Sequence, residues 1–196
     1  MIQYWEKKER IETGVGEDVD WESHSKAIKN FIPWRMWLTK HCSGWVGSGK
    51  MMLKWNYRDN AKCPRCDKCQ HVGNINSFIK ATEPLKEWLK ETTSPRIKSL
   101  VMTHMKAYQR DIPVNGFRTS NEETKQLSQA QDALGRRSFG AGFLAHGWRD
   151  LQMKYYGGTE GKEKSTRWVT KLIQKIWEVS WAMWESRNHL IHHDTE

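Results

Sequence analysis

The sequence predicts a mainly α fold, an irregular helical bundle, and three observations support this prediction. Apolar residues recur at intervals of three and four along most of the 196-residue chain. Residues that favour helix ends stand at the borders of these apolar runs. One cysteine-rich stretch, residues 63–71, interrupts the pattern. We therefore expect helices along most of the chain, with one small loop insertion between them.

Residues 1–20 predict a flexible N-terminal arm, because a short charged stretch is followed by a break around Gly14. Asp20 is the expected N-cap of the first helix of the bundle, which Pro33 ends. A second helix is indicated by residues at positions i, i+3, i+4 and i+7, namely Trp34, Trp37, Leu38 and His41. We expect this helix to end near Ser43.

Four more helices are expected between the cysteine-rich stretch and the long C-terminal helix. Thr82 is the expected N-cap of a short helix, and Ser94 with Pro95 begins the next. Ser120 and Glu123 have the spacing of a capping box. The helix that they open ends at Gly135, and a glycine-rich turn, RRSFGAGF, leads to another helix, which Gly157 closes. The apolar faces of these helices are built mainly from Leu85, Trp88, Leu89, Ile97, Leu100, Val101, His104, Tyr108, Leu127, Ala130, Leu134, Trp148, Leu151 and Tyr155.

The longest helix is expected from Thr166 to about Ile191. Its wide, tryptophan-rich apolar face predicts the central helix of a bundle, with a partner-binding coiled coil or an aromatic platform for nucleic acid as alternatives. Charged residues within it exclude a membrane span: Lys171, Lys175, Glu178 and Glu185. Histidines 189, 192 and 193 have a spacing that could bind metal, but we prefer a frayed polar C-terminus as their explanation.

The stretch CPRCDKCQH at residues 63–71 holds sulfur and nitrogen donors that bind zinc. Two residues separate Cys63 from Cys66, so their thiolates can bind one tetrahedral ion, and Pro64 favours the turn between them. Four residues separate Cys66 from His71, as in the zinc knuckles of nucleic-acid-binding proteins. Asn76 occupies the place of the fourth donor, a cysteine, in that spacing.

Cys69 is the substitute donor that we expect, because Cys69 and His71 point to the same side in extended backbone. With it, the stretch would form a closed Cys3His shell, and the fold becomes a helical bundle with a small zinc-knuckle loop insertion. The alternative is that these thiols are reduced and bind no metal. His41 and Cys42 are a second candidate donor pair, but we prefer a helix-terminal histidine and a half-buried cysteine as their explanation.

The net charge of +9 favours a polyanionic partner, and nucleic acid is the default. Because the positive charge looks spread along the chain, the alternative is a protein whose lysines only cover its surface. Tyr57 and Trp55 are rings near the predicted knuckle that could stack on unpaired bases, although core packing is our preferred interpretation of Trp55. The basic residues expected to contact phosphate are Arg58, Lys62, Arg65 and Lys68.

No motif in the chain predicts catalysis. The string GWVGSGKM at residues 44–51 resembles a phosphate-binding loop, but Met51 replaces its last hydroxyl residue and a helix precedes it, so we reject nucleotide binding. A closed Cys3His shell leaves no position for a catalytic water. No apolar run approaches the roughly 20 residues that span a bilayer, and the N-terminus lacks a signal-peptide core. We expect a non-enzymatic intracellular protein, nuclear or cytoplasmic.

In order along the chain, these pieces resemble a known family. The resemblance is carried by WRMWLTKH at 34–41, by GSGKMMLKWNYRDNAKCPRC at 47–66 with His71 after it, and by the closing helix WVTKLIQKIWEVSWAMWESRNHLIHH. The glycine-rich stretch QDALGRRSFGAGFLAHGWRDLQMKYY also contributes. The chain resembles the region downstream of the polymerase in non-LTR-type retroelement polyproteins, including the reverse-transcriptase-associated zinc-binding domain, over most of residues 34–193.

The resemblance implies that Cys63, Cys66 and His71 are metal ligands. The family's usual last cysteine is absent here, so either Cys69 replaces it or this copy no longer binds zinc. The family's polymerase aspartates, in a Tyr-x-Asp-Asp setting, do not occur in this chain, and no acidic set resembles a ribonuclease H or endonuclease centre. The resemblance therefore implies a nucleic-acid-binding tail without its enzyme.

We expect three parts in this chain: the arm at 1–20, a helical zinc-knuckle module at 21–80, and a helical tail at 81–196. The expected function is to hold RNA or single-stranded DNA as template, with a polymerase protein as a further candidate partner. The alternative is a protein-interaction module that docks through the tryptophan-rich C-terminal helix, with a structural or lost zinc site.

Overall fold

The structure, a computed structural model, describes residues 2–7, 11–31, 34–43, 53–54, 56, 59, 75–114, 121–135, 137–157 and 160–193. Helices dominate these ranges, and their only β-type pairing is an isolated bridge between Val19 and Ala145. The predicted mainly α bundle is thus confirmed. The elements are α1 (Ile2–Lys7), the 3-10 helix η1 (Gly16–Asp18), α2 (Trp21–Asn30), α3 (Arg35–Ser43), α5 (Ile75–Thr92), α6 (Pro95–Arg110), α7 (Glu122–Ala133), α8 (Gly147–Tyr156) and α9 (Gly161–His193).

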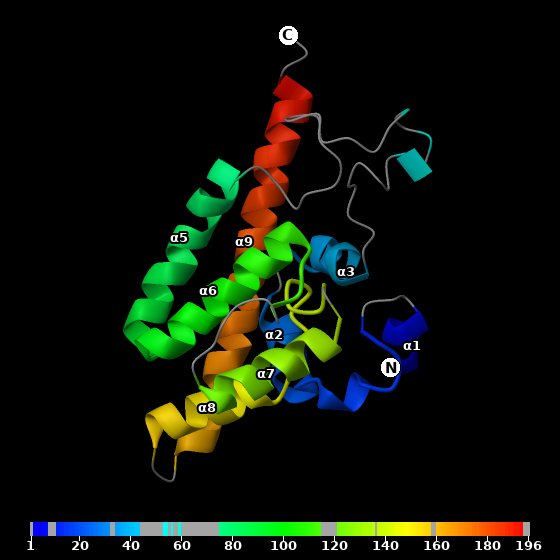
Figure 1. Cartoon of the computed structure of the whole chain (residues 1–196). Helices are drawn as coiled ribbons and strands as arrows, with labels where there is room; N and C mark the ends of the chain where they lie inside the picture. The colour runs from blue at the N-terminus through cyan, green and yellow to red at the C-terminus, as the bar shows by residue number, and fades with distance from the viewer. Residues whose placement is uncertain are drawn as a thin grey trace.

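Helix α9 is the central element, and α2, α5 and α8 all pack on it. Figure 1 shows α9 running the length of the molecule, with α5 on one side and α3 on the other. Six consecutive core positions of α9 are almost fully buried: Trp168, Val169, Leu172, Ile173, Ile176 and Trp177. This burial confirms the prediction that the wide apolar face belongs to the central helix of a bundle. None of the described helices combines the length and apolar composition that a bilayer crossing requires.

Helix α5 begins earlier than the sequence indicated. Thr82 is not its N-cap, because the helix starts at Ile75 and the Thr82 hydroxyl donates to the carbonyl oxygens of Phe78 and Ile79 at 3.0 Å. Such back-bonding accommodates threonine inside a helix. Phe78 is buried one turn before Thr82 and so extends the apolar face backward. The helix therefore runs without a break across the predicted border at residue 80.

The caps of the neighbouring helices agree with the sequence except at α7. Asp20 accepts a hydrogen bond from the Ser23 amide at 3.1 Å, and Ser94 accepts one from Ile97, as predicted. The cap of α7 is Asn121 rather than the expected Ser120. Its side-chain oxygen accepts from the amides of the second and third helical residues at 2.8 and 3.4 Å. Asparagine and serine are about equally good N-caps, so the observed cap differs from the expected one by a single position.

The described part of residues 1–20 packs against the body of the molecule. Ile11 and Val19 are buried in the hydrophobic core, and the Trp5 ring lies 5.3 Å from that of Phe143. Backbone hydrogen bonds also hold this segment in place. In one of them, the Asp20 N–H donates to the Leu144 carbonyl at 2.8 Å. One continuous core therefore includes residues from all three predicted parts.

The turn between α7 and α8 is buried, and a single glutamine makes several of the hydrogen bonds that its polar groups need. Gln131 on α7 is 1% exposed. Its amide nitrogen donates to Ser138 Oγ at 2.9 Å and to the Phe143 carbonyl at 3.0 Å. Its oxygen accepts from the Ala145 amide at 3.0 Å and from the indole N–H of Trp148 at 2.9 Å. Water does not reach the polar backbone groups of a buried turn, so the Gln131 side chain supplies their hydrogen bonds in place of water.

Replacing Gln131 with leucine should destabilise the fold by roughly 3 kcal/mol or more, because several buried polar groups would lose their partner. Gln129→Leu is the matched control, since Gln129 is exposed on the same helix. Urea unfolding followed by circular dichroism measures both. Equal transition midpoints for the two variants would contradict this role of Gln131.

Candidate nucleic-acid interface

All the predicted site residues lie outside the described part of the chain. This holds for the four expected zinc ligands and for the five expected nucleic-acid contacts. They are Cys63, Cys66, Cys69 and His71, and Tyr57, Arg58, Lys62, Arg65 and Lys68. The structure does describe the helices on either side of the segment that holds these residues. Helix α3 precedes this segment and α5 follows it.

Helices α3 and α5 both contact the C-terminal half of α9. The ring of Trp34, at the start of α3, stacks on that of Trp181 with centroids 5.1 Å apart and planes 7° apart. Trp37 meets the same indole edge-on at 5.2 Å. On the other side, the hydroxyls of Ser77 and Ser186 lie 3.1 Å apart. Trp181 and Ser186 are five residues apart, about 7.5 Å along α9, so α9 contacts the N-terminal ends of both helices within this distance.

Helix α3 has one buried face and one exposed face. Trp37, Leu38 and Cys42 are buried in the core. The opposite face is exposed and carries two basic residues and no acidic residue. We call these exposed positions the α3 face: Arg35, Met36, Thr39 and Lys40.

The buried side of α3 is hydrogen bonded to the glycine-rich turn. His41 Nε2 lies 3.0 Å from the Gly140 carbonyl oxygen, and Cys42 Sγ donates to the Ala141 carbonyl at 3.4 Å. Because a carbonyl only accepts, His41 carries its proton on Nε2. Both side chains thus have a structural role, which favours the non-metal interpretation of this pair. Among the described residues, no group of three or more metal-binding side chains comes together.

Helices α2 and α9 bond to the same turn. His24 Nδ1 lies 2.9 Å from the Gly142 carbonyl oxygen, and the indole N–H of Trp177 donates to the Ala141 carbonyl at 3.1 Å. Three consecutive carbonyls, from residues 140 to 142, therefore accept bonds from α2, α3 and α9. We call them the carbonyl cluster. The sequence did not predict the carbonyl cluster, although it does contain the glycine-rich stretch RRSFGAGF.

Two glycines of this turn are required by their surroundings. A Cβ on Gly140 would lie 2.2 Å from the Tyr108 ring. Gly142 has φ +80°, and a Cβ there would come within 2.8 Å of Ile173 and Trp177. The turn can therefore approach α6 and α9 only because these residues lack side chains.

Two buried histidines have pKa values well below the ordinary one. Burial lowers the pKa of His24 to about 4, against the opposing effects of the Gly142 hydrogen bond and the Asp20 carboxylate. Burial alone lowers the pKa of His104 to about 3, and its Nε2 has no hydrogen-bond partner. His104 instead packs between the rings of Phe139 and Trp148. Both imidazoles are therefore neutral near pH 7.

Comparison with known proteins adds no family to these findings. No family model matches the chain, and no match is found among the curated proteins or the solved structures. The resemblance to the post-polymerase region of retroelement proteins therefore stays a prediction based on the residues quoted above.

Folding stability should fall as the pH is lowered from about 6.5 toward 4. The unfolded histidines protonate near pH 6.5, while the folded ones do so only near 4 and 3. Over this interval the unfolded state binds more protons, so acid favours it, at about 1.4 kcal/mol per pKa unit. Urea midpoints measured between pH 7.5 and 4 report the loss.

His104→Leu should make that pH dependence shallower, because it removes one of the two depressed imidazoles and leaves no donor unpaired. His189→Gln, which changes an exposed histidine of α9, is the control for the loss of a histidine. If His104→Leu followed the same pH profile as the parent chain, His104 would not be a source of the acid sensitivity.

Proposed function

We propose that this chain is a non-catalytic nucleic-acid-binding module of retroelement origin, stabilised by zinc at residues 63–71, which holds RNA or single-stranded DNA. One observation carries the proposal. Residues 23–82 contain 11 basic and 2 acidic residues, a net charge of +9, which equals the net charge of the whole chain. The other 136 residues contain 21 basic and 21 acidic residues.

This count corrects the expectation that the positive charge is spread. Lysines that merely cover a surface accompany a similar number of acidic residues, and that is the situation outside residues 23–82. Inside this range, residues 23–58 contribute +7 and residues 59–82, which include the predicted knuckle, contribute +2. A local excess of cations favours a polyanion, because neutralising phosphates releases condensed counterions.

The proposed contacts follow from the donor and cation types in the knuckle. Cys63, Cys66, Cys69 and His71 would hold the zinc ion, whose role is to fix the local chain conformation. The phosphate contacts would come from the basic residues that alternate with these ligands: Arg58, Lys62, Arg65 and Lys68. Tyr57 would stack on an unpaired base.

The second candidate is a protein-interaction module that docks through the C-terminal part of α9. The half-buried rings of Trp181 and Trp184 favour it, since they keep part of their surface exposed. Trp168 and Trp177 do not, because they are buried in the core. Self-association of the purified chain without retention of nucleic acid would favour this candidate over the first.

Purified protein should contain about one zinc ion per chain, because the 63–71 stretch supplies a full tetrahedral donor set. Elemental analysis measures the metal. Cys69→Ser should lower the zinc content if Cys69 is the replacement donor, whereas Cys42→Ser, which changes a buried cysteine of α3, should not. Metal-free parent protein that is fully folded would contradict the zinc site.

Binding to single-stranded RNA should weaken steeply with salt. Four phosphate contacts on a single strand predict a slope of about −3 in a plot of log binding constant against log salt concentration. Fluorescence anisotropy of a labelled oligouridine measures it. A slope near zero would remove the phosphate contacts and with them the proposed function.

A further inference from the structure

We infer that the outward face of α6 binds the phosphate backbone of a nucleic-acid duplex. This inference goes beyond the proposed function, because it adds a second ligand and places it on described residues outside the segment that holds the predicted knuckle. The surface consists of exposed or half-buried side chains that all donate hydrogen bonds. We call it the α6 face: Lys98, Ser99, Thr103, Lys106, Gln109 and Arg110.

The α6 face has an excess of positive charge in a part of the chain where acidic and basic residues otherwise balance. From Thr92 to Arg110, 19 residues in succession include four lysines or arginines and no aspartate or glutamate. Lys98, Lys106 and Arg110 take part in no ion pair with the described residues. Their charges are therefore available to an anionic ligand.

The carboxylates that border α6 are engaged with other cations. Asp111, the C-cap of α6, lies 3.6 Å from Arg137. Glu123 of α7 lies 3.6 Å from Arg96 and also pairs with Lys154. Helix α5, which packs beside α6, carries three acidic and three basic residues. In each case the cations at least equal the carboxylates in number, so these neighbours leave the charge of the α6 face uncompensated.

Helix stability does not explain these cations. Lys98 lies in the first turn of α6, near the positive end of the helix dipole, where a cation is unfavourable. The dipole favours Arg110 in the last turn, but Lys106 is four residues away on the same face and repels it. The placement of the three charges therefore costs helix stability, whereas it suits the binding of an anion.

The chemistry of the α6 face favours a duplex backbone over a single strand. Single strands are bound by exposed aromatic rings on which unpaired bases stack. The α6 face has no such ring, because Tyr108 of the same helix lies against Gly140 of the glycine-rich turn. The groups that the α6 face does present are ammonium, guanidinium, hydroxyl and amide groups, which contact phosphate oxygens without reading the base sequence.

The length and rigidity of α6 also suit a duplex. Lys98 and Arg110 are twelve residues apart, about 18 Å along the helix, and about ten phosphate charges of a duplex lie within that length. The opposite side of α6 is fixed in the core, where Ile97, Val101 and Met105 are at most 2% exposed. The cations are therefore held in place before binding, which reduces the entropy that contact with a stiff duplex costs.

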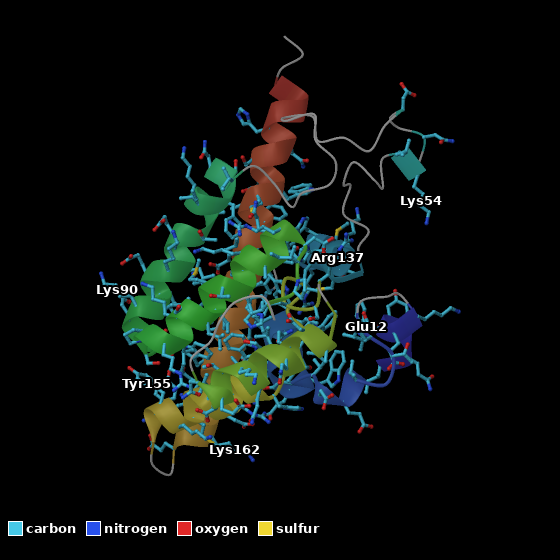
Figure 2. All side chains as sticks on the ribbon, viewed as in Figure 1. Glu12, Lys54, Lys90, Arg137, Tyr155 and Lys162 are labelled. Atoms are coloured by element: carbon cyan, nitrogen blue, oxygen red, sulfur yellow. The ribbon has the colours of Figure 1, made fainter. Side chains whose placement is uncertain are left out.

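The test compares two triple variants that remove the same charge. The first changes the α6 face: Lys98→Gln, Lys106→Gln and Arg110→Gln. The second, the matched control, changes exposed residues of α1, α2 and α9: Lys7→Gln, Lys26→Gln and Lys162→Gln. Figure 2 shows Lys162 at the lower end of the molecule, away from α6.

Urea unfolding of both variants checks for a structural role. Glutamine favours helix about as well as lysine and arginine do. The α6 variant should therefore unfold at the same urea concentration as the parent chain or at a higher one, because unfavourable charges are removed. A lower midpoint would give these cations a structural role and overturn the inference.

Anisotropy titrations of the full chain with a short labelled DNA duplex, at several salt concentrations, give the main readout. The α6 variant should make the slope of log binding constant against log salt concentration shallower by about 3, because each of three phosphate contacts contributes about 0.9. The control should leave the slope unchanged. A second duplex of unrelated sequence should bind the parent chain equally well, since phosphate contacts carry no sequence information.

The same titrations with a labelled oligouridine separate this inference from the proposed function. The α6 variant should leave the oligouridine slope unchanged, because the proposed single-strand contacts are knuckle residues. Parent protein that binds the duplex but not oligouridine supports the inference and overturns the proposed function. Parent protein that binds oligouridine but not the duplex does the reverse, and binding of neither overturns both.

Three further outcomes would overturn the inference. An equal loss of slope in both triple variants would mean that net charge alone explains duplex binding. A loss of the oligouridine slope in the α6 variant would assign the α6 face to a single strand. Binding of polyglutamate that is as tight as duplex binding and equally sensitive to the α6 variant would assign the face to an acidic protein.

Discussion

Three buried backbone carbonyls, at Gly140, Ala141 and Gly142, are the constraint on which the arrangement of helices depends. A buried carbonyl without a donor costs about as much as a lost hydrogen bond, so each must find one nearby. The donors come from three helices: His24 of α2, His41 and Cys42 of α3, and Trp177 of α9. Satisfying three adjacent acceptors with side chains from three helices fixes the positions of those helices relative to one another.

This constraint explains how an exposed surface can be held rigidly by a helix as short as α3. Nine residues would not form a stable helix alone in water. Here Trp37 and Cys42 lie in the core, and His41 is tied to the turn. The side chains that remain outward are then presented in one orientation. The packing of one face therefore defines the geometry of the other.

The helices were predictable from sequence because their signals are local, whereas the carbonyl cluster was not. Asp20, Ser94 and Gly157 mark helix ends within a few residues of the apolar runs that they border. The cap of α7 was missed by one residue because two capping residues stand side by side. By contrast, 118 residues separate His24 from Gly142, and 99 separate His41 from Gly140. Only the folded chain shows that a buried polar histidine and a distant glycine turn satisfy each other.

The distribution of charge along the chain is uneven. Residues 1–22 carry a net charge of −4 and residues 83–196 carry +4, so the two balance. The structure shows where they meet: Arg149 of α8 lies 3.4 Å from the buried Asp20 and 3.1 Å from Glu22. The bundle is thereby assembled from segments of opposite charge, without net repulsion. The net charge of the chain therefore equals that of residues 23–82, and a polyanion that neutralises these cations together would be favoured.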